Sequence, residues 1–516
     1  MSRRRLVAAA LVVVAPLVPL AARVGAQCKV AKLVEPVVVD ETPSFGVAVA
    51  LHDGVAVVGH SNAPFSAWPS WVFELQPSGW TAGTALPPGQ AVTCYGDSVA
   101  VWGDTAVVAG EDLNDASVAA SVFERVGGTW SQGVKLHAPE QLLQLSPGLS
   151  VAIEEDTILV ADVHVSAAYV YERGAGGWAL TQTLTPSGSI PAAFGFSASL
   201  RGGRAVIGGC FVSGSEFPGT AWVFERQGGA FVEVAQLVPG DADGDDSSGT
   251  VLAQAGDTIV LGAPNHDLGT AFSGLGAVHV FELVAGAWTE TAFVTAPFPL
   301  LGDFFGASLA LQDDLLVVGA PQRDGTLPSV GAAFAYRRAG AAWQHVATLQ
   351  AQEPQAYGFF GASLAIDGDM LLVGAPASST LVEDRVHVLR GVQGLTDWLP
   401  VGGGVAGGGS PCTFGTGEPA VGAPATVTLV GALPAQPGWL VLGVERINAP
   451  FKGGVLVPAP QLLVPLLTDA KGGKTFGWTW PPGLPPGLKL SLQHWIVDAG
   501  APFGLAGGNA LVVAVP

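Results

Sequence analysis

The sequence repeats itself with a period near 50 residues. The stretch "FGASLALQDDLLVVGAP" at 305–321 returns as "FGASLAIDGDMLLVGAP" at 360–376. Further units align on the same glycine and give a series of anchor glycines: Gly46, Gly96, Gly148, Gly195, Gly249, Gly306 and Gly361. A period of this length favours a propeller blade of four strands over a helical solenoid. The repeat therefore predicts a ring of similar small sheets.

Each unit has the same internal pattern. Thirteen residues after every anchor, a small residue ends an apolar run: Gly59, Ala109, Ala161, Gly208, Gly262, Gly319 and Gly374. Pairs such as Asp53-Gly54 and Asp313-Asp314 lie seven and eight residues after the anchor glycine. Gly and Asp tolerate positive φ, so these pairs are expected to form tight hairpin turns. A third strand ("AYVYER") and a more polar fourth ("WQHVATL") follow. Seven such units predict an all-β fold, a seven-bladed β-propeller of four-stranded blades.

The pattern "FG…GAP" followed by strands such as "AWVFER" resembles the FG-GAP repeat, the unit of integrin α-chain propellers and of many exported bacterial proteins. The resemblance covers roughly residues 28–394, and the last three units keep a full Gly-Ala-Pro at 262–264, 319–321 and 374–376. It implies a propeller with a binding role. Integrin-type units bind calcium in an Asp-rich insertion between their first two strands. Here that connection is a bare turn, too short to surround an ion, so the calcium role does not pass to Asp313 and Asp314.

The first 26 residues have the pattern of a signal peptide. Arg3, Arg4 and Arg5 precede the apolar run 6–22, and small residues lead to a cleavage site near Ala26. Removing this segment takes away four of the 22 basic residues and none of the 42 acidic ones, which leaves a net charge of −24. Such a surface repels nucleic acid and anionic membranes. We expect a secreted, extracellular or periplasmic protein with no transmembrane segment in the mature chain.

The order of segments predicts three parts after the signal peptide. Residues 27–398 are expected to form the propeller, with residues 28–36 ("CKVAKLVEP") closing the last blade, since they copy the fourth strand "GVKLHAPE" at 133–140. Their expected partner is the strand at 385–389, whose edge is otherwise open. A Gly-rich linker at 399–411 leads to residues 412–516, where seven apolar runs separated by turns predict a small β-sandwich.

Four cysteines in an exported chain invite disulfides. Cys28 opens the closing strand at the end of the ring from which the chain leaves towards Cys412. A Cys28–Cys412 disulfide is therefore one hypothesis, and four free cysteines are the alternative.

The long variable connections of the units share one mouth of the ring, because strand direction alternates. Recognition commonly resides in variable loops on a rigid scaffold, although such loops are also where neutral surface variation collects. The ligand expected there is cationic, cation-bridged or a polar glycan, or else an extracellular protein. The candidate ligand-binding residues are Phe65, Trp68, Phe211, Phe217, His266, Asp267 and Phe272.

One acidic cluster, "GDADGDDSS" at 240–248, is the candidate metal site. Its carboxylates are Asp241, Asp243, Asp245 and Asp246. Their alternation resembles the opening of a calcium loop, but Leu252 stands where a bidentate glutamate is needed. Calcium binding and a solvated acidic loop remain the two alternatives, and the sequence indicates no other cofactor.

The sequence contains no recognisable catalytic motif, neither a metalloprotease helix nor a phosphate loop nor a cysteine–histidine arrangement. The favoured function is therefore non-catalytic binding or adhesion. The alternative is a polysaccharide-active hydrolase or lyase built on the same propeller, because fold alone does not separate the two. An enzyme would bring at least two ionisable side chains with perturbed pKa together in one pocket.

Overall fold

The structure is a computed structural model of the chain. It describes residues 29–36, 44–60, 68–76, 79–88, 92–93, 95–112, 118–139, 148–187, 194–209, 219–240, 246–267, 274–325, 327–340, 342–351, 354–377, 385–390, 392, 399–400, 412–416, 424–430, 432–444, 446–451, 454–458, 460–470, 473–479, 489–501, 505–507 and 511–514. These residues contain many strands and no α-helix. None of their elements is a helix long and apolar enough to cross a membrane.

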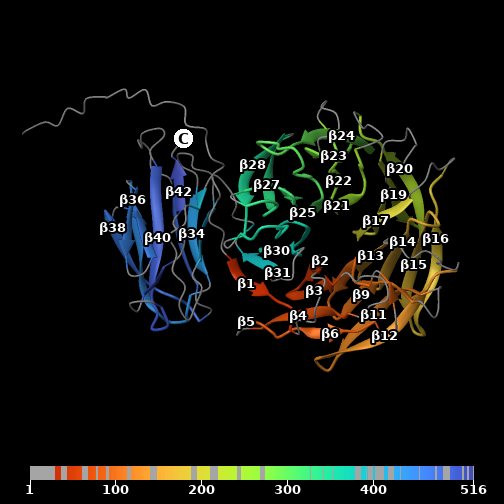
Figure 1. Ribbon diagram of the computed structural model, residues 1–516, viewed down its shortest axis with the longest axis horizontal. Coiled ribbons are helices and arrows are strands. Elements are labelled where there is room, and N and C mark those ends of the chain that lie inside the picture. Colours follow the sequence, from red (N-terminus) through yellow and green to blue (C-terminus); the bar gives the residue numbers. More distant parts are fainter. Residues whose placement is uncertain are drawn as a thin grey trace, which may run out of the picture.

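The repeats fold into successive antiparallel sheets arranged like the blades of a propeller (Figure 1). In chain order, the first sheet contains β2 (Phe45–His52), β3 (Val55–His60) and β4 (Ser70–Gln76), and both β5 (Gly79–Trp80) and β6 (Thr84–Leu86) pair with β4. The second sheet contains β8 (Val99–Trp102), β9 (Thr105–Ala109), β11 (Val118–Val126) and β12 (Thr129–His137). The third contains β13 (Leu149–Glu154), β14 (Thr157–Asp162), β15 (Ala167–Gly174) and β16 (Gly177–Leu184), and the fourth contains β17 (Phe194–Arg201), β18 (Arg204–Gly209), β19 (Thr220–Gln227) and β20 (Ala230–Leu237). The next sheet contains β21 (Val251–Ala255), β22 (Thr258–Ala263), β23 (Ala277–Val284) and β24 (Ala287–Val294). It is followed by a sheet of β25 (Ser308–Gln312), β26 (Leu315–Ala320), β27 (Ala332–Ala339) and β28 (Ala342–Leu349). The last sheet of the repeat region contains β29 (Ser363–Asp367), β30 (Met370–Ala375), β31 (Arg385–Arg390) and β1 (Lys29–Leu33). A short ladder joins β7 (Val92–Thr93) to β10 (Glu111–Asp112).

The apolar runs of the repeat are the second strands of these sheets, and they are buried along all or nearly all of their length. In β22 and β26 every residue is buried, so neither face of the strand meets water. Apolar clusters extend from one sheet into the next; Val260, Phe305 and Leu316, for example, belong to one cluster across two sheets. A strand buried on both faces does not need alternating polarity, which is why the repeats contain unbroken runs such as "LLVV".

The two small positions of the repeat meet across the blade junctions at which both are glycine. The anchor Gly361 has φ +93°, a left-handed conformation that favours glycine. Its carbonyl oxygen lies where a Cβ on Gly319 of the preceding sheet would stand, and it accepts a hydrogen bond from Ser308 Oγ at 2.6 Å. The same overlap would arise between Gly59 and Gly96, Gly208 and Gly249, and Gly262 and Gly306. The fixed offset of thirteen residues is therefore the signature of a contact between units.

This contact also closes the ring. A Cβ on Gly374, in the last repeat, would overlap the carbonyl oxygen of Gly46 in the first, and Ser363 Oγ donates a hydrogen bond to the same oxygen at 2.7 Å. β1 pairs antiparallel with β31 and gives that sheet its outer strand, so both ends of the repeat region contribute to one sheet (Figure 1).

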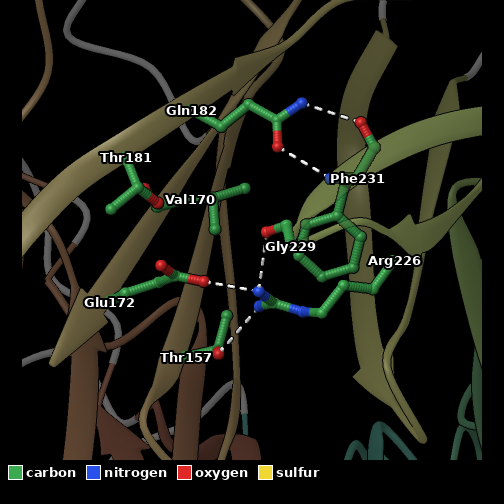
Figure 2. Close-up of polar contacts among 8 residues, drawn as sticks. All are labelled: Thr157, Val170, Glu172, Thr181, Gln182, Arg226, Gly229 and Phe231. Carbon is green, nitrogen blue, oxygen red and sulfur yellow. Dashed lines mark hydrogen bonds and ion pairs between the residues drawn. The ribbon is translucent and has the colours of Figure 1, made fainter.

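Outside the inner strands, charged side chains join neighbouring sheets. Figure 2 shows Arg226 of β19 reaching Glu172 of β15, with Nη1 at 2.6 Å from the carboxylate, while the guanidinium lies 4.6 Å from the Phe231 ring centroid. The side-chain amide of Gln182 bonds both backbone groups of Phe231, at 2.7 and 2.8 Å (Figure 2). The Glu-Arg pair that recurs in the third strands thus links one blade to the next. The pairs of the same kind are Glu74–Arg125, Glu124–Arg173 and Glu282–Arg338.

The carboxyl-terminal part forms further antiparallel sheets. The largest contains β32 (Leu399–Pro400), β42 (Leu511–Ala514), β40 (Lys489–Val497), β35 (Pro437–Gly443) and β38 (Leu462–Leu467), with β41 (Leu505–Gly507) also on β40. A second contains β33 (Cys412–Thr416), β34 (Pro424–Val430) and β39 (Lys474–Thr479), and β36 (Arg446–Phe451) pairs with β37 (Gly454–Pro458). Val427 and Leu429 of β34 pack with Leu440, Leu492 and Ile496 of the largest sheet, so one apolar core joins the two sheets.

Candidate functional site

The two mouths of the propeller differ in their connections. The first and second strands of the blade sheets are joined by two-residue turns, such as 313–314 and 368–369. At the opposite mouth, the connections between second and third strands run from four residues (163–166) to thirteen (264–276). Because the sheets are antiparallel, the connections from a fourth strand to the next sheet lie at this mouth too. We call it the loop mouth and its opposite the turn mouth.

The structure places three of the candidate ligand-binding residues at the loop mouth. Trp68 stands just before β4, and His266 and Asp267 follow β22. The other four candidates, Phe65, Phe211, Phe217 and Phe272, lie outside the described residues. So do Asp241, Asp243, Asp245 and Cys28, while Cys412 begins β33.

Asp246 and His266 form a close acid–base contact at this mouth. Asp246 is 3 % exposed and His266 8 %, and an Oδ2–Nδ1 distance of 3.0 Å joins them. The backbone also ties the two segments, because Asn265 N donates to Asp246 O. The carboxylate of Asp246 is therefore not a solvated surface group. Among the described residues, which leave out Asp241, Asp243 and Asp245, no group of three or more His, Cys, Asp or Glu is placed to hold a metal ion.

The next repeat contains an equivalent pair. Asp303 and Arg323 are 1 % and 6 % exposed, and the guanidinium binds the carboxylate directly. Arg323 also donates to Phe298 O at 3.1 Å and lies over the Phe334 ring. Burial raises the pKa of Asp303, and the charge of Arg323 opposes that rise.

Both pairs occupy the same positions of the repeat. The acid stands three residues before the anchor glycine, and the base stands seventeen residues after it. Asp246 and His266 are separate candidates in the sequence, where nothing predicts that they pair, and Asp303 and Arg323 are not among the candidates. Alignment of the units on their anchors contains the signal, because an acid and a base recur at fixed offsets in two consecutive units.

A second histidine of the same blade lies beside this pair. His279 is fully buried, and its Nδ1 lies 2.8 Å from Glu290 Oε1. The rings of His266 and His279 both pack against Phe293, with centroids 5.3 and 5.2 Å away. Two histidine–carboxylate pairs thus share one aromatic side chain at the edge of the loop mouth.

A fourth acid–base pair lies where the ring closes. Glu35, just after β1, lies 4.0 Å from the Nδ1 of His60, which ends β3. His60 is 3 % exposed, and the candidate residue Trp68 packs 6.2 Å from its ring. Burial raises the pKa of Glu35, against the effect of the nearby Trp71 indole, and burial lowers the pKa of His60 to about 4. Burial therefore shifts both pKa values in the direction that favours the neutral form.

We expect His60 to make the protein sensitive to acid. The folded pKa of about 4 lies below the ordinary 6.5, so the unfolded chain binds the proton first as the pH falls. The free energy of unfolding should therefore drop by about 3 kcal/mol between pH 6.5 and pH 4 from this residue. Glu35 opposes part of the loss, because its raised pKa means that the folded state gains its proton first. Urea unfolding of the native chain and of His60→Phe at pH 7 and pH 4.5 measures the effect. Equal losses in the two proteins would contradict it.

Comparisons with known proteins support the assignment of the repeat. A family model described as the FG-GAP repeat matches residues 231–281, 288–336 and 343–386. Integrin alpha-M of Mus musculus is 26% identical over 203 residues, which are 35% of this chain and 16% of the relative. Integrin alpha-D of Homo sapiens is 32% identical over 136 residues, which are 23% of this chain and 11% of the relative. The chain thus spans less than a fifth of either integrin chain.

Among solved structures, Sqt1 from Chaetomium thermophilum superposes with a TM-score of 0.42 at 12% identity, covering 73% of this chain and 94% of that one. The matches to the repeat model and to the integrin chains agree with the anchors, turns and sheets described above. The chain contains FG-GAP repeats folded into a β-propeller, and it is similar to integrin alpha chains.

Proposed function

We propose that the protein is an exported, non-catalytic binding or adhesion protein whose loop mouth recognises an extracellular protein or a polar glycan. The difference between the two mouths carries this proposal. Two-residue turns leave little surface to vary at the turn mouth, whereas loops of different length give each blade its own surface at the other. Similarity to integrin alpha chains supports a binding role. Export rests on the signal-peptide pattern, with cleavage near Ala26.

The proposal includes the division of the chain. Residues 27–398 form a seven-bladed propeller, 399–411 a linker, and 412–516 a β-sandwich. The repeated junction between sheets supports the first part, and the apolar core that joins the β34 and β40 sheets supports the last. A rigid ring of sheets suits a binding protein, because it holds loops from distant parts of the sequence at fixed distances from one another.

Loop exchange tests the proposal. The mature chain is first screened on arrays of extracellular proteins and of polar glycans. Shortening 263–276 or 210–220 should then abolish binding to the selected ligand, while replacing Asp313-Asp314 with Asn-Gly should leave it unchanged. Asp313 already has φ +53°, so Asn-Gly suits that turn and makes a matched control at the turn mouth. Binding that survives both loop deletions and is lost with the turn variant would refute the proposal.

A further inference from the structure

Apolar side chains are exposed on three consecutive connections of the loop mouth. They are Phe298, Leu300 and Leu301 between β24 and β25, Leu327 between β26 and β27, and Tyr357 between β28 and β29, and they are 43 to 76 % exposed. Single apolar side chains scattered over a surface need no explanation, whereas several gathered at one mouth indicate an interaction site. We call these five residues the apolar patch.

Hydrogen bonds join the three connections to one another. Arg323 Nη1, in the second connection, donates to Phe298 O in the first at 3.1 Å. Tyr357 N, in the third, donates to Pro328 O in the second at 2.9 Å, directly beside Leu327. Tyr357 also has φ +58°, a strained conformation of the kind that gathers at binding and catalytic sites. The residues of the apolar patch therefore stand on backbone segments that are bonded together.

Buried groups hold the first connection in place. Tyr336 OH donates to Thr295 O at 2.7 Å, and Leu300 N donates to Asp303 Oδ2 at 3.1 Å. Asp303 is in turn bound to the buried Arg323, so one buried pair fixes the backbone of residues 298–303 while the leucines stay exposed. A surface that is already ordered loses less conformational entropy when it binds a partner.

The charge beside the apolar patch is negative. The connections 295–303, 321–331 and 350–358 contain the acidic residues Asp303, Asp324 and Glu353 and one basic residue, Arg323, which leaves a charge of −2. The Asp303 and Arg323 charges balance each other within their buried pair. Asp324 is exposed, and its Oδ1 accepts a hydrogen bond from Ser329 N at 2.8 Å, which fixes the carboxylate. The surface therefore suits a partner that is both apolar and positively charged.

We propose that the apolar patch binds a segment of an extracellular protein in which an aromatic or aliphatic side chain stands beside a lysine or arginine. The apolar side chain packs on Leu301 and its neighbours, and the cation lies at Asp324. A polar glycan would leave the three leucines without an apolar partner. A second copy of this chain, or an anionic membrane, would be repelled by its net charge of −20. The proposal rests on the proposed binding function and specifies its ligand.

An array of dodecapeptides, acetylated and amidated so that the ends carry no charge, is the probe for the mature chain. We expect the array to select an aromatic or aliphatic residue next to Lys or Arg. Changing the apolar residue of the best peptide to Ser, or its basic residue to Gln, should weaken binding. Fluorescence anisotropy measures the dissociation constants.

Leu301→Ser tests the apolar contact, and Val126→Ser is its matched control. Val126 is 70 % exposed at the turn-mouth end of β11, so both changes remove a well-exposed apolar side chain. Leu301→Ser should weaken peptide binding about tenfold or more, and Val126→Ser should leave it unchanged. Because both side chains are exposed, we expect both variants to unfold in urea at the same midpoint as the native chain.

Asp324→Asn tests the charge without removing the local hydrogen bond, because the asparagine Oδ1 can still accept from Ser329 N. This variant should weaken peptide binding about two- to fivefold, as expected for an exposed ion pair. Its binding should also depend less on salt than that of the native chain. Unchanged binding and unchanged salt dependence would contradict the place given to the cation.

Three results would overturn the inference. They are an array that does not select apolar residues beside basic ones, equal peptide binding by Leu301→Ser and Val126→Ser, and tight binding of phosphatidylcholine vesicles that Leu301→Ser abolishes. The proposed function has a separate readout. A ligand from the protein or glycan arrays that is lost on shortening 210–220 would leave it standing in each of these cases, so the two proposals fail separately.

Discussion

Replacing Gly374 with alanine should destabilise the protein by about 3 kcal/mol, although the change adds only one methyl group. The new Cβ would overlap the backbone carbonyl of Gly46, which also accepts the hydrogen bond of Ser363. A backbone oxygen cannot rotate away as a side chain can, so the first and last blades would have to separate. Urea unfolding followed by tryptophan fluorescence gives the change in the free energy of unfolding.

Gly174→Ala is the matched control. Gly174 ends β15, its Cβ would meet no atom within 4 Å, and its φ is not positive. The control should therefore lie within about 0.5 kcal/mol of the native chain. If Gly374→Ala were as stable as Gly174→Ala, the close approach of the two backbones would be wrong.

Removing β1 should have the larger effect. A chain that starts at residue 37 lacks the strand beside β31 and loses Leu33, which is 2 % exposed and packs in one cluster with Phe45 and Val386. Losing a buried leucine alone costs about 2–5 kcal/mol, and the exposed edge of β31 would then pair with other chains. We expect no cooperative thermal transition and large species in size-exclusion chromatography.

A chain that starts at residue 29 is the reference for this truncation. A synthetic peptide of residues 29–36, added to the shorter chain during refolding, should restore a single transition, because it supplies the missing strand. A shorter chain that melts like the longer one would show that β1 does not stabilise the ring.

The architecture could be predicted because it depends on positions that every unit shares. The offset between the anchor glycine and the second small residue, as in Gly361 and Gly374, fixes the length of each first hairpin, and the family model confirms the FG-GAP resemblance. The closing strand could be located in the same way, since residues 28–36 look like a fourth strand and β31 is the strand that lies beside β1.

The loop mouth could be predicted only in outline. Alternating strand direction gives its position, but the pairing of its side chains depends on where each connection turns. Asp303 and Arg323 are twenty residues apart and meet because two different connections converge on one blade junction. Glu35 and His60 meet only because the amino-terminal strand joins the last blade and the chain then continues to the first. The hydrophobic pattern of the sequence does not predict such contacts between side chains of different connections.

The contact between Gly374 and Gly46 is of the same kind as that between Gly319 and Gly361, although the first joins the two ends of the repeat region and the second joins neighbours. Around the inner strands the ring therefore has no chemical beginning or end. A circularly permuted chain, cut in another loop, would keep the same set of junctions.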